Sequence, residues 1–234
     1  MGLSWGHLKW VIRDETCLKN IVTIANICIE IGYWPNYFKN SITIVIPKSN
    51  KVLYDSSKSF RPIVLLNTLG KLIEKVIGDR LQFHIISNNF IYQSQLEGLK
   101  FKSTTDTGIA LTHFIHMEWI KNMVTSSLAF DIMQFFLLLN HHLLALILGK
   151  VGFNSRVINF FSNYLINRRT KYFWNNFSSL SFDVNMGVDQ GSAFFPILSA
   201  LYLSLFYSLL TMVFFLCKAN LFRFPMPAFL VVTI

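Results

Sequence analysis

The stretch SLAFDIMQFF, residues 127–136, decides the fold class of this 234-residue chain. Residues Ser126 to Ile132 are predicted to form an apolar strand that carries a single carboxylate, Asp131, near its end. A carboxylate in apolar surroundings is costly unless it is paired, binds a cation or reaches the surface. Asp131 is therefore a candidate cation ligand, and an exposed Asp that caps the next helix is the alternative.

The segments on either side alternate irregularly between helical and extended patterns. Helical spacing of apolar residues predicts helices over 18–31, 63–83 (capped at Asn67 or Thr68), 104–120, 143–151 and 157–165. Extended patterns predict further strands over 42–46, 170–173 and 181–188. Such an order indicates an α+β architecture rather than a repeat or a helical bundle.

The run from Gln190 to Cys217 contains no charged residue. Its hydropathy fits a transmembrane helix, but Pro196 near its start and several hydroxyl side chains suit a buried helix of a large core equally well. We favour the buried helix and keep the membrane helix as the alternative. The charges at Lys9 and Arg13 disfavour a signal peptide, so an intracellular location, nuclear or cytoplasmic, is expected.

The chain is strongly basic, with 21 Lys and Arg against 12 Asp and Glu and a formal charge of +9. This balance favours a polyanionic partner such as nucleic acid, although a membrane surface fits the charge alone equally well. The three cysteines lie far apart and indicate neither a disulfide framework nor a four-ligand zinc site.

Two further motifs could contact phosphates. GVDQGS, residues 187–192, is a glycine-flanked turn ahead of the apolar run, where backbone can approach a ligand closely. PKSNK, residues 47–51, and SFRP, residues 59–62, place cations beside a predicted strand. Solvated loops are the alternative interpretation of both basic segments.

Six segments in order resemble reverse transcriptases of non-LTR (LINE-type) retrotransposons, with fungal elements as the most similar. They are ITIVIPKSNK (42–51), SFRPIVLLNTLGKLIEKVIGDRL (59–81), KSTTDTGIALTH (102–113), SLAFDIMQFFLLLNH (127–141), GFNSRVINFFSNYLINRRTKYFWNNFSSLSFDVNMGV (152–188) and DQGSAFFPILSALYLS (189–204). The resemblance covers roughly residues 34–205, and six ordered segments are far more specific than any one of them.

The resemblance implies a right-hand polymerase fold with fingers, an incomplete palm and no thumb. It divides the chain into an N-terminal helical segment (1–41), a fingers-like region (42–124), a palm-like region with an interleaved fingers segment (125–208) and an aberrant or truncated hydrophobic tail (209–234). It also implies an RNA template, a DNA primer and a dNTP as partners, and Mg²⁺ as the cofactor of a two-metal mechanism. No protein partner follows from the sequence.

The resemblance also assigns roles to individual residues. Asp131 matches the first catalytic carboxylate, the backbone carbonyl of Ile132 a second metal contact, and Phe136 an aromatic gate against the ribose 2′-hydroxyl, with a packed core position as the alternative for Phe136. The matching nucleotide contacts are Lys48, Arg61, Gln190 and Gly191, and the matching nucleic-acid contacts are Lys51, Lys102, Arg168, Arg169 and Lys171.

The sequence departs from the family pattern towards its end. The family supplies further metal ligands from an Asp-Asp hairpin, but residues 190–234 contain no Asp or Glu. Asp189 itself stands where relatives usually have Pro or Gly. We therefore expect a degenerate or truncated copy that is inactive alone; the alternatives are a small basic membrane protein anchored by residues 190–217 and a nucleic-acid-binding remnant without catalysis.

Overall fold

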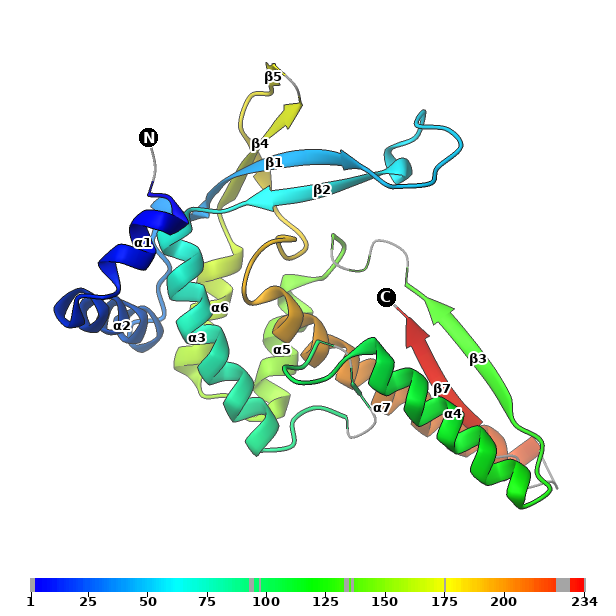
Figure 1. Ribbon diagram of the computed structural model, residues 1–234. Helices are drawn as coiled ribbons and strands as arrows, with labels where there is room; N and C mark the ends of the chain where they lie inside the picture. The colour runs from blue at the N-terminus through cyan, green and yellow to red at the C-terminus, as the bar shows by residue number, and fades with distance from the viewer. Residues whose placement is uncertain are drawn as a thin grey trace.

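The computed structural model places a sheet above a helical core, with a smaller two-stranded sheet to one side (Figure 1). It describes residues 3–92, 95–96, 98–132, 135, 137–174, 176–221 and 228–233. The helices are α1 (Trp5–Val11), α2 (Glu15–Glu30), α3 (Thr68–Ser87), α4 (Thr104–Ile120), α5 (His141–Val151), α6 (Ser155–Leu165) and α7 (Phe195–Leu221). The strands are β1 (Asn40–Pro47), β2 (Phe60–Leu65), β3 (Ser126–Asp131), β4 (Arg168–Trp174), β5 (Phe177–Ser178), β6 (Phe182–Val184) and β7 (Ala228–Thr233). The α+β class predicted from the sequence is correct.

The main sheet joins segments that are far apart in the chain. Strand β1 pairs antiparallel with β2 and parallel with β4, and β4 pairs in turn with β5 and β6. The β1 sequence Ile-Thr-Ile-Val-Ile has the β-branched composition that favours extended backbone. The parallel pair is fixed by a buried hydrogen bond of 2.8 Å between the hydroxyls of Thr43 and Thr170.

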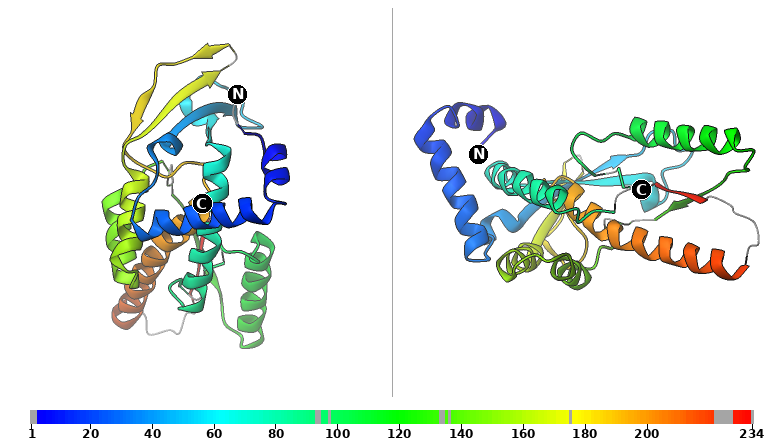
Figure 2. Two further views of the ribbon diagram at one scale, coloured as in Figure 1. Left: turned by 90° about the vertical axis from the view of Figure 1, so that its left-hand side faces the viewer. Right: turned by 90° about the horizontal axis from the view of Figure 1, so that it is seen from below.

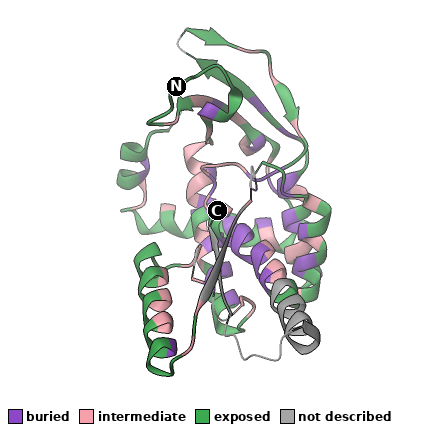
Figure 3. Cartoon of the chain, turned by 90° about the vertical axis from the view of Figure 1, so that its right-hand side faces the viewer, coloured by how far each residue is buried: buried purple, intermediate pink, exposed green. Residues whose placement is uncertain are grey.

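The core lies where α2, α3, α5, α6 and the first half of α7 meet, and Figure 3 shows the buried residues gathered there. Ile73, Ile77 and Leu81 recur along one face of α3 at helical spacing, so this face is buried. Trp34 packs edge-on against Phe160 and Tyr164 of α6. These aromatic contacts fix α6 against the segment that leads into β1.

The sequence prediction is wrong at residues 63–65. They were expected to begin a helix, but they continue strand β2, and α3 begins only at Thr68. Asn67 caps the helix as predicted, because its side chain accepts hydrogen bonds from the N–H groups of Leu69 and Gly70. The preceding segment is held extended by its ladder with β1, an interaction that helical periodicity cannot reveal.

Helix α7 covers most of the uncharged run for which a membrane helix was the alternative. Its described side chains enter the core, where Leu198, Leu201 and Leu203 are buried. Tyr202 packs edge-on against Phe135. In the part of the chain that the structure describes, no helix has both the length and the apolar character needed to cross a membrane.

Strand β3 ends at Asp131 and pairs in parallel with β7, where Asp131 lies opposite Thr233. Both views in Figure 2 place this two-stranded sheet between α4 and α7. The predicted strand over 126–132 is therefore correct to within one residue.

Candidate functional site

The turn that precedes α7 is hydrogen-bonded to strand β2 and to the segment before α5. The N–H of Val64 in β2 donates to the carbonyl of Gln190 at 3.0 Å, and the N–H of Gly187 donates to the carbonyl of Leu139 at 3.0 Å. Gly187 and Gly191 both have positive φ, 75° and 140°, which favours glycine at these positions. We call residues 186–193 the glycine turn.

Gly191 is required at the point where the glycine turn meets β2. A Cβ atom built on Gly191 would overlap the carbonyl oxygen of Val64, and the positive φ would strain any L residue there. The sequence predicted that backbone approaches a ligand closely at this glycine. In the structure, Gly191 closely approaches the backbone of β2.

Arg168 fixes the glycine turn to the start of β4. Its side chain is only 4% exposed and lies 3.0 Å from Oδ1 of Asp189. It also donates hydrogen bonds to the carbonyls of Met186 and Gly187, at 3.1 and 2.7 Å. In this structure the guanidinium of Arg168, which was predicted to contact nucleic acid, faces partners inside the domain.

Glu74 of α3 fixes the other end of the glycine turn. Its Oε2 accepts from the hydroxyl of Ser192 at 2.9 Å and from the N–H of Ala193 at 3.0 Å, and its Oε1 accepts from the Tyr164 hydroxyl at 2.9 Å. Burial raises the pKa of Glu74 to about 7, although these three hydrogen bonds act in the opposite direction. Burial, followed by the nearby Glu74 charge, raises the pKa of Tyr164.

Glu74, Tyr164 and His141 were not predicted from the sequence as residues of this site. Glu74 is only 2% exposed. His141 lies 2.8 Å from the carbonyl of Gly187 and 3.3 Å from Arg168, and burial lowers its pKa. A signal for Glu74 was present in the sequence, because it follows Ile73 and precedes Ile77 within the buried stripe of α3.

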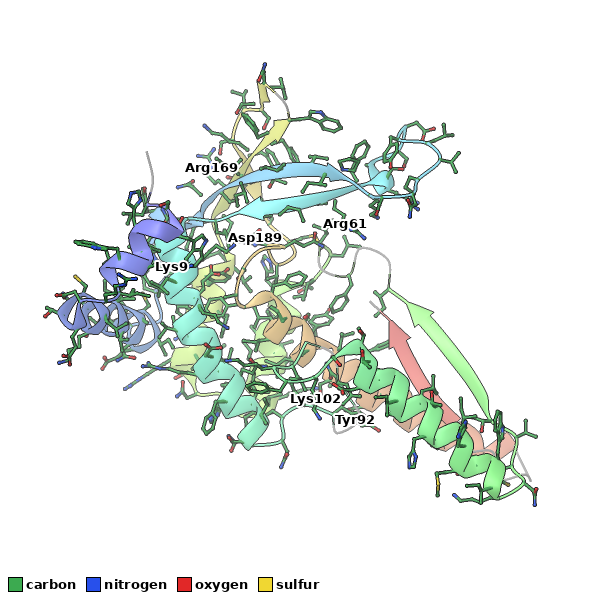
Figure 4. The ribbon with its side chains drawn as sticks, viewed as in Figure 1. Lys9, Arg61, Tyr92, Lys102, Arg169 and Asp189 are labelled. Atoms are coloured by element: carbon green, nitrogen blue, oxygen red, sulfur yellow. The ribbon has the colours of Figure 1, made fainter. Side chains whose placement is uncertain are left out.

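The remaining predicted cations do not form one cluster. Arg169 follows Arg168 on β4, so it points to the opposite face, where it pairs with Asp183 at 3.1 Å and is exposed. Lys171 is also exposed on this strand, and Lys51 is exposed in the loop after β1. Lys102 lies apart from the sheet, just before α4 (Figure 4).

Lys48 and Arg61 flank the loop between β1 and β2. Lys48 is half-buried; its N–H donates to the carbonyl of Ser59 at 2.8 Å, and its own carbonyl accepts from the Tyr54 hydroxyl at 2.7 Å. Arg61 is exposed on β2. Figure 4 shows it below the strand, on the side of the sheet where the glycine turn and its residue Asp189 lie. Of these cations, Arg61 therefore lies on the side of the sheet where the glycine turn is found.

The predicted metal-binding residues are only partly described. Asp131 ends β3, whose backbone alone is described, Ile132 packs against the core, and Phe136 lies outside the described residues. Among the described side chains, no group of three or more His, Cys, Asp or Glu could hold a metal ion. These side chains therefore do not fit a two-metal centre.

The fold is an α+β domain in which the glycine turn is held against a mixed sheet. Comparison with known proteins identifies the class. A family model described as "Reverse transcriptase (RNA-dependent DNA polymerase)" matches residues 46–224, and the chain belongs to this family.

Two Drosophila melanogaster proteins are similar to the chain. The probable RNA-directed DNA polymerase from transposon BS is 26% identical over 182 residues, which is 78% of this chain and 20% of that protein. The RNA-directed DNA polymerase from mobile element jockey is 34% identical over 70 residues, 30% of this chain and 8% of that protein. The chain therefore spans at most a fifth of the length of these relatives.

Proposed function

We propose that the chain is the nucleotide-binding and template-binding portion of a retrotransposon reverse transcriptase, and that these 234 residues do not polymerise DNA by themselves. The observation that carries the binding function is the glycine turn, which Val64, Arg168 and Glu74 hold from three sides. Rigid backbone beside exposed cations binds phosphates at a low cost in conformational entropy. The two relatives are named as RNA-directed DNA polymerases from transposon BS and from mobile element jockey, which supports a retrotransposon origin.

The fold supports a division into fingers and palm. On this proposal the sheet of β1, β2, β4, β5 and β6 belongs to the fingers, and β3 with α5, α6 and the first half of α7 belongs to the palm. The parallel pairing of β1 with β4 supports an interleaved fingers segment, because it returns residues 168–174 to the sheet begun by residues 40–47.

The proposed ligands are an RNA template, a DNA primer and a dNTP. Lys48, Arg61, Gln190 and Gly191 are proposed to contact the nucleotide, and Lys51, Lys102, Arg169 and Lys171 the nucleic-acid backbone. Among the described residues, the amide N–H groups of Gln190 and Gly191 donate to no protein acceptor, so both remain available to an anion.

Catalysis is proposed to be absent because the carboxylates are too few. The family implies a divalent metal, and two such ions require several oxygen ligands in fixed geometry. Asp131 is the proposed first ligand, and residues 190–234 add no Asp or Glu. A single carboxylate cannot hold two ions in reacting positions.

Primer extension on poly(rA)·oligo(dT) with Mg²⁺ and dTTP tests the proposal, together with an anisotropy measurement of binding to the same duplex. The chain should bind with an affinity that falls steeply with salt, and it should not incorporate nucleotide. A version whose tail is replaced by a relative's Asp-Asp hairpin should gain incorporation, and Asp131→Ala should abolish that gain.

Two outcomes would overturn the proposal. Incorporation by the unmodified chain, lost on Asp131→Ala, would refute the proposed inactivity. Absence of duplex binding at 50 mM salt by a folded chain would refute the nucleic-acid function itself.

A further inference from the structure

Glu74 is a buried acid that has no part in the nucleotide and nucleic-acid contacts proposed above. It lies on α3, outside the glycine turn, and it is 2% exposed. The nearby cation Arg168 is already paired with Asp189. Burying a carboxylate without its own cation weakens folding. The role of Glu74 therefore depends on the groups that its two oxygens hold in place.

Both oxygens of Glu74 act on one end of the glycine turn. Oε2 accepts from the Ser192 hydroxyl and from the Ala193 N–H, while Oε1 accepts from Tyr164 of α6. The Ser192 hydroxyl lies 2.9 Å from that of Tyr164 and accepts from the N–H of Phe194 at 3.0 Å. Three elements, α3, α6 and the start of α7, therefore meet at this carboxylate.

We propose that Glu74 is a positioning residue that holds the glycine turn in the conformation that presents the Gln190 and Gly191 amides to the nucleotide. This inference rests on the function proposed above. Val64 fixes Gln190 and Arg168 fixes Gly187 from the side of the sheet, and Glu74 fixes Ser192 and Ala193 from the side of the helices. The two free amides lie between these anchors, so movement at either end would move them.

Two substitutions separate this positioning from general stability. In Glu74→Gln, the amide oxygen can accept from Ser192 and Ala193, and the amide nitrogen can donate to the Tyr164 hydroxyl, which then donates to Ser192. Every hydrogen bond of the network is thus retained without a charge. Glu74→Met fills a similar volume and also removes the buried charge, but it cannot accept hydrogen bonds from Ser192 and Ala193 as a carboxylate oxygen does.

The test combines hydrogen exchange over residues 186–197 with binding of poly(rA)·oligo(dT) and dTTP, and urea unfolding serves as the check on folding. At pH 8 both variants should unfold at urea concentrations no lower than the wild type. Glu74→Met should lose at least tenfold in dTTP affinity and lose exchange protection at Ala193, whereas Glu74→Gln should stay within twofold of the wild type. Gln82→Met, which replaces another buried polar side chain on α3, is the matched control and should change neither.

Equal dTTP affinity for Glu74→Met and the wild type would overturn the positioning role. If the folded wild type binds neither duplex nor dTTP, the proposed function fails, and hydrogen exchange alone decides on Glu74. In that case, loss of protection in the Met variant but not in the Gln variant supports the positioning of the turn. Unchanged protection in both variants refutes it.

Discussion

Nη1 of Arg168 lies 3.0 Å from Oδ1 of Asp189, and both side chains are almost completely buried. The pair connects the first residue of β4 to the glycine turn. It also gives a structural role to the acid at position 189, which the resemblance described from the sequence treats as a departure from the family pattern. Asp189 is the counter-charge of the buried Arg168. An acid at this position is therefore not in itself a sign that the gene copy is degenerate.

Removal of either partner should destabilise the domain, because the other charge stays buried. We expect Asp189→Ala to lower the free energy of unfolding by about 3 to 5 kcal/mol. The measurement is urea denaturation at pH 7. As a matched control, Asp183→Ala removes the partner of Arg169, but that pair is 53% and 66% exposed and should contribute less than about 1 kcal/mol. Equal effects of the two variants would contradict the structural role assigned to Arg168.

Glu74 should make stability depend on pH. Burial raises the pKa of Glu74 from its ordinary value of 4.5 to about 7 in the folded protein, so the folded state holds the proton more tightly. The contribution of Glu74 to stability is therefore fully present below pH 4.5 and is lost as the pH rises through 7. The total corresponds to roughly 3 kcal/mol.

Glu74→Gln cannot titrate and should therefore gain stability over the wild type as the pH rises. Urea denaturation at pH 5 and pH 8 measures this gain, and the difference between the two proteins cancels the titration of other groups such as His141. A constant difference between the two proteins at both pH values would show that Glu74 is already ionised at pH 5.

Gly191→Ala should release the glycine turn from β2. The new methyl group would overlap the Val64 carbonyl, and the residue would keep a φ that alanine disfavours. The expected cost is about 1 to 3 kcal/mol, with a loss of poly(rA)·oligo(dT) binding. Gly108→Ala is the control, since no heavy atom lies within 4 Å of a Cβ built there. This control should bind like the wild type.

Lys171 should contribute to binding through phosphate contacts alone. Replacing one phosphate contact reduces the slope of log K against log salt by about 1, and Lys171→Gln should do so for any nucleic-acid sequence. The equivalent change at Lys9, which is exposed on α1 away from the sheet, should leave the slope unchanged. A sequence-dependent effect at Lys171 would argue for base contacts instead.

Local signals in the sequence were sufficient to predict most of the elements. Asn67 caps the start of α3, and Ser103 forms a capping box with Asp106 at the start of α4. Long-range pairing was not predictable in the same way. The parallel ladder between β1 and β4 depends on contacts across the chain, and residues 63–65 are extended because β1 lies beside them.

The sequence indicated where the glycine turn lies, but not which side chains hold it in place. The glycine turn was found from its two glycines, and the exposure of Arg169 and Lys171 agrees with a surface role. Arg168 and Arg169 are neighbours on a strand, so their side chains lie on opposite faces, and the sequence does not show which face is buried. The buried network around Glu74 joins residues 90 and 118 positions apart, beyond the reach of any local pattern.

The pairing of β1 with β4 has a consequence for how the protein is made. Ser41 and Arg169 are joined by a hydrogen bond across 128 residues. At ribosomal rates of about 5 to 20 residues per second, β1 waits roughly 6 to 26 s for its parallel partner to be synthesised. During that interval the apolar strand can pair only with β2, and an isolated hairpin is marginally stable in water. The nascent chain therefore carries an unpaired strand edge, the kind of edge that favours aggregation, until its second half emerges.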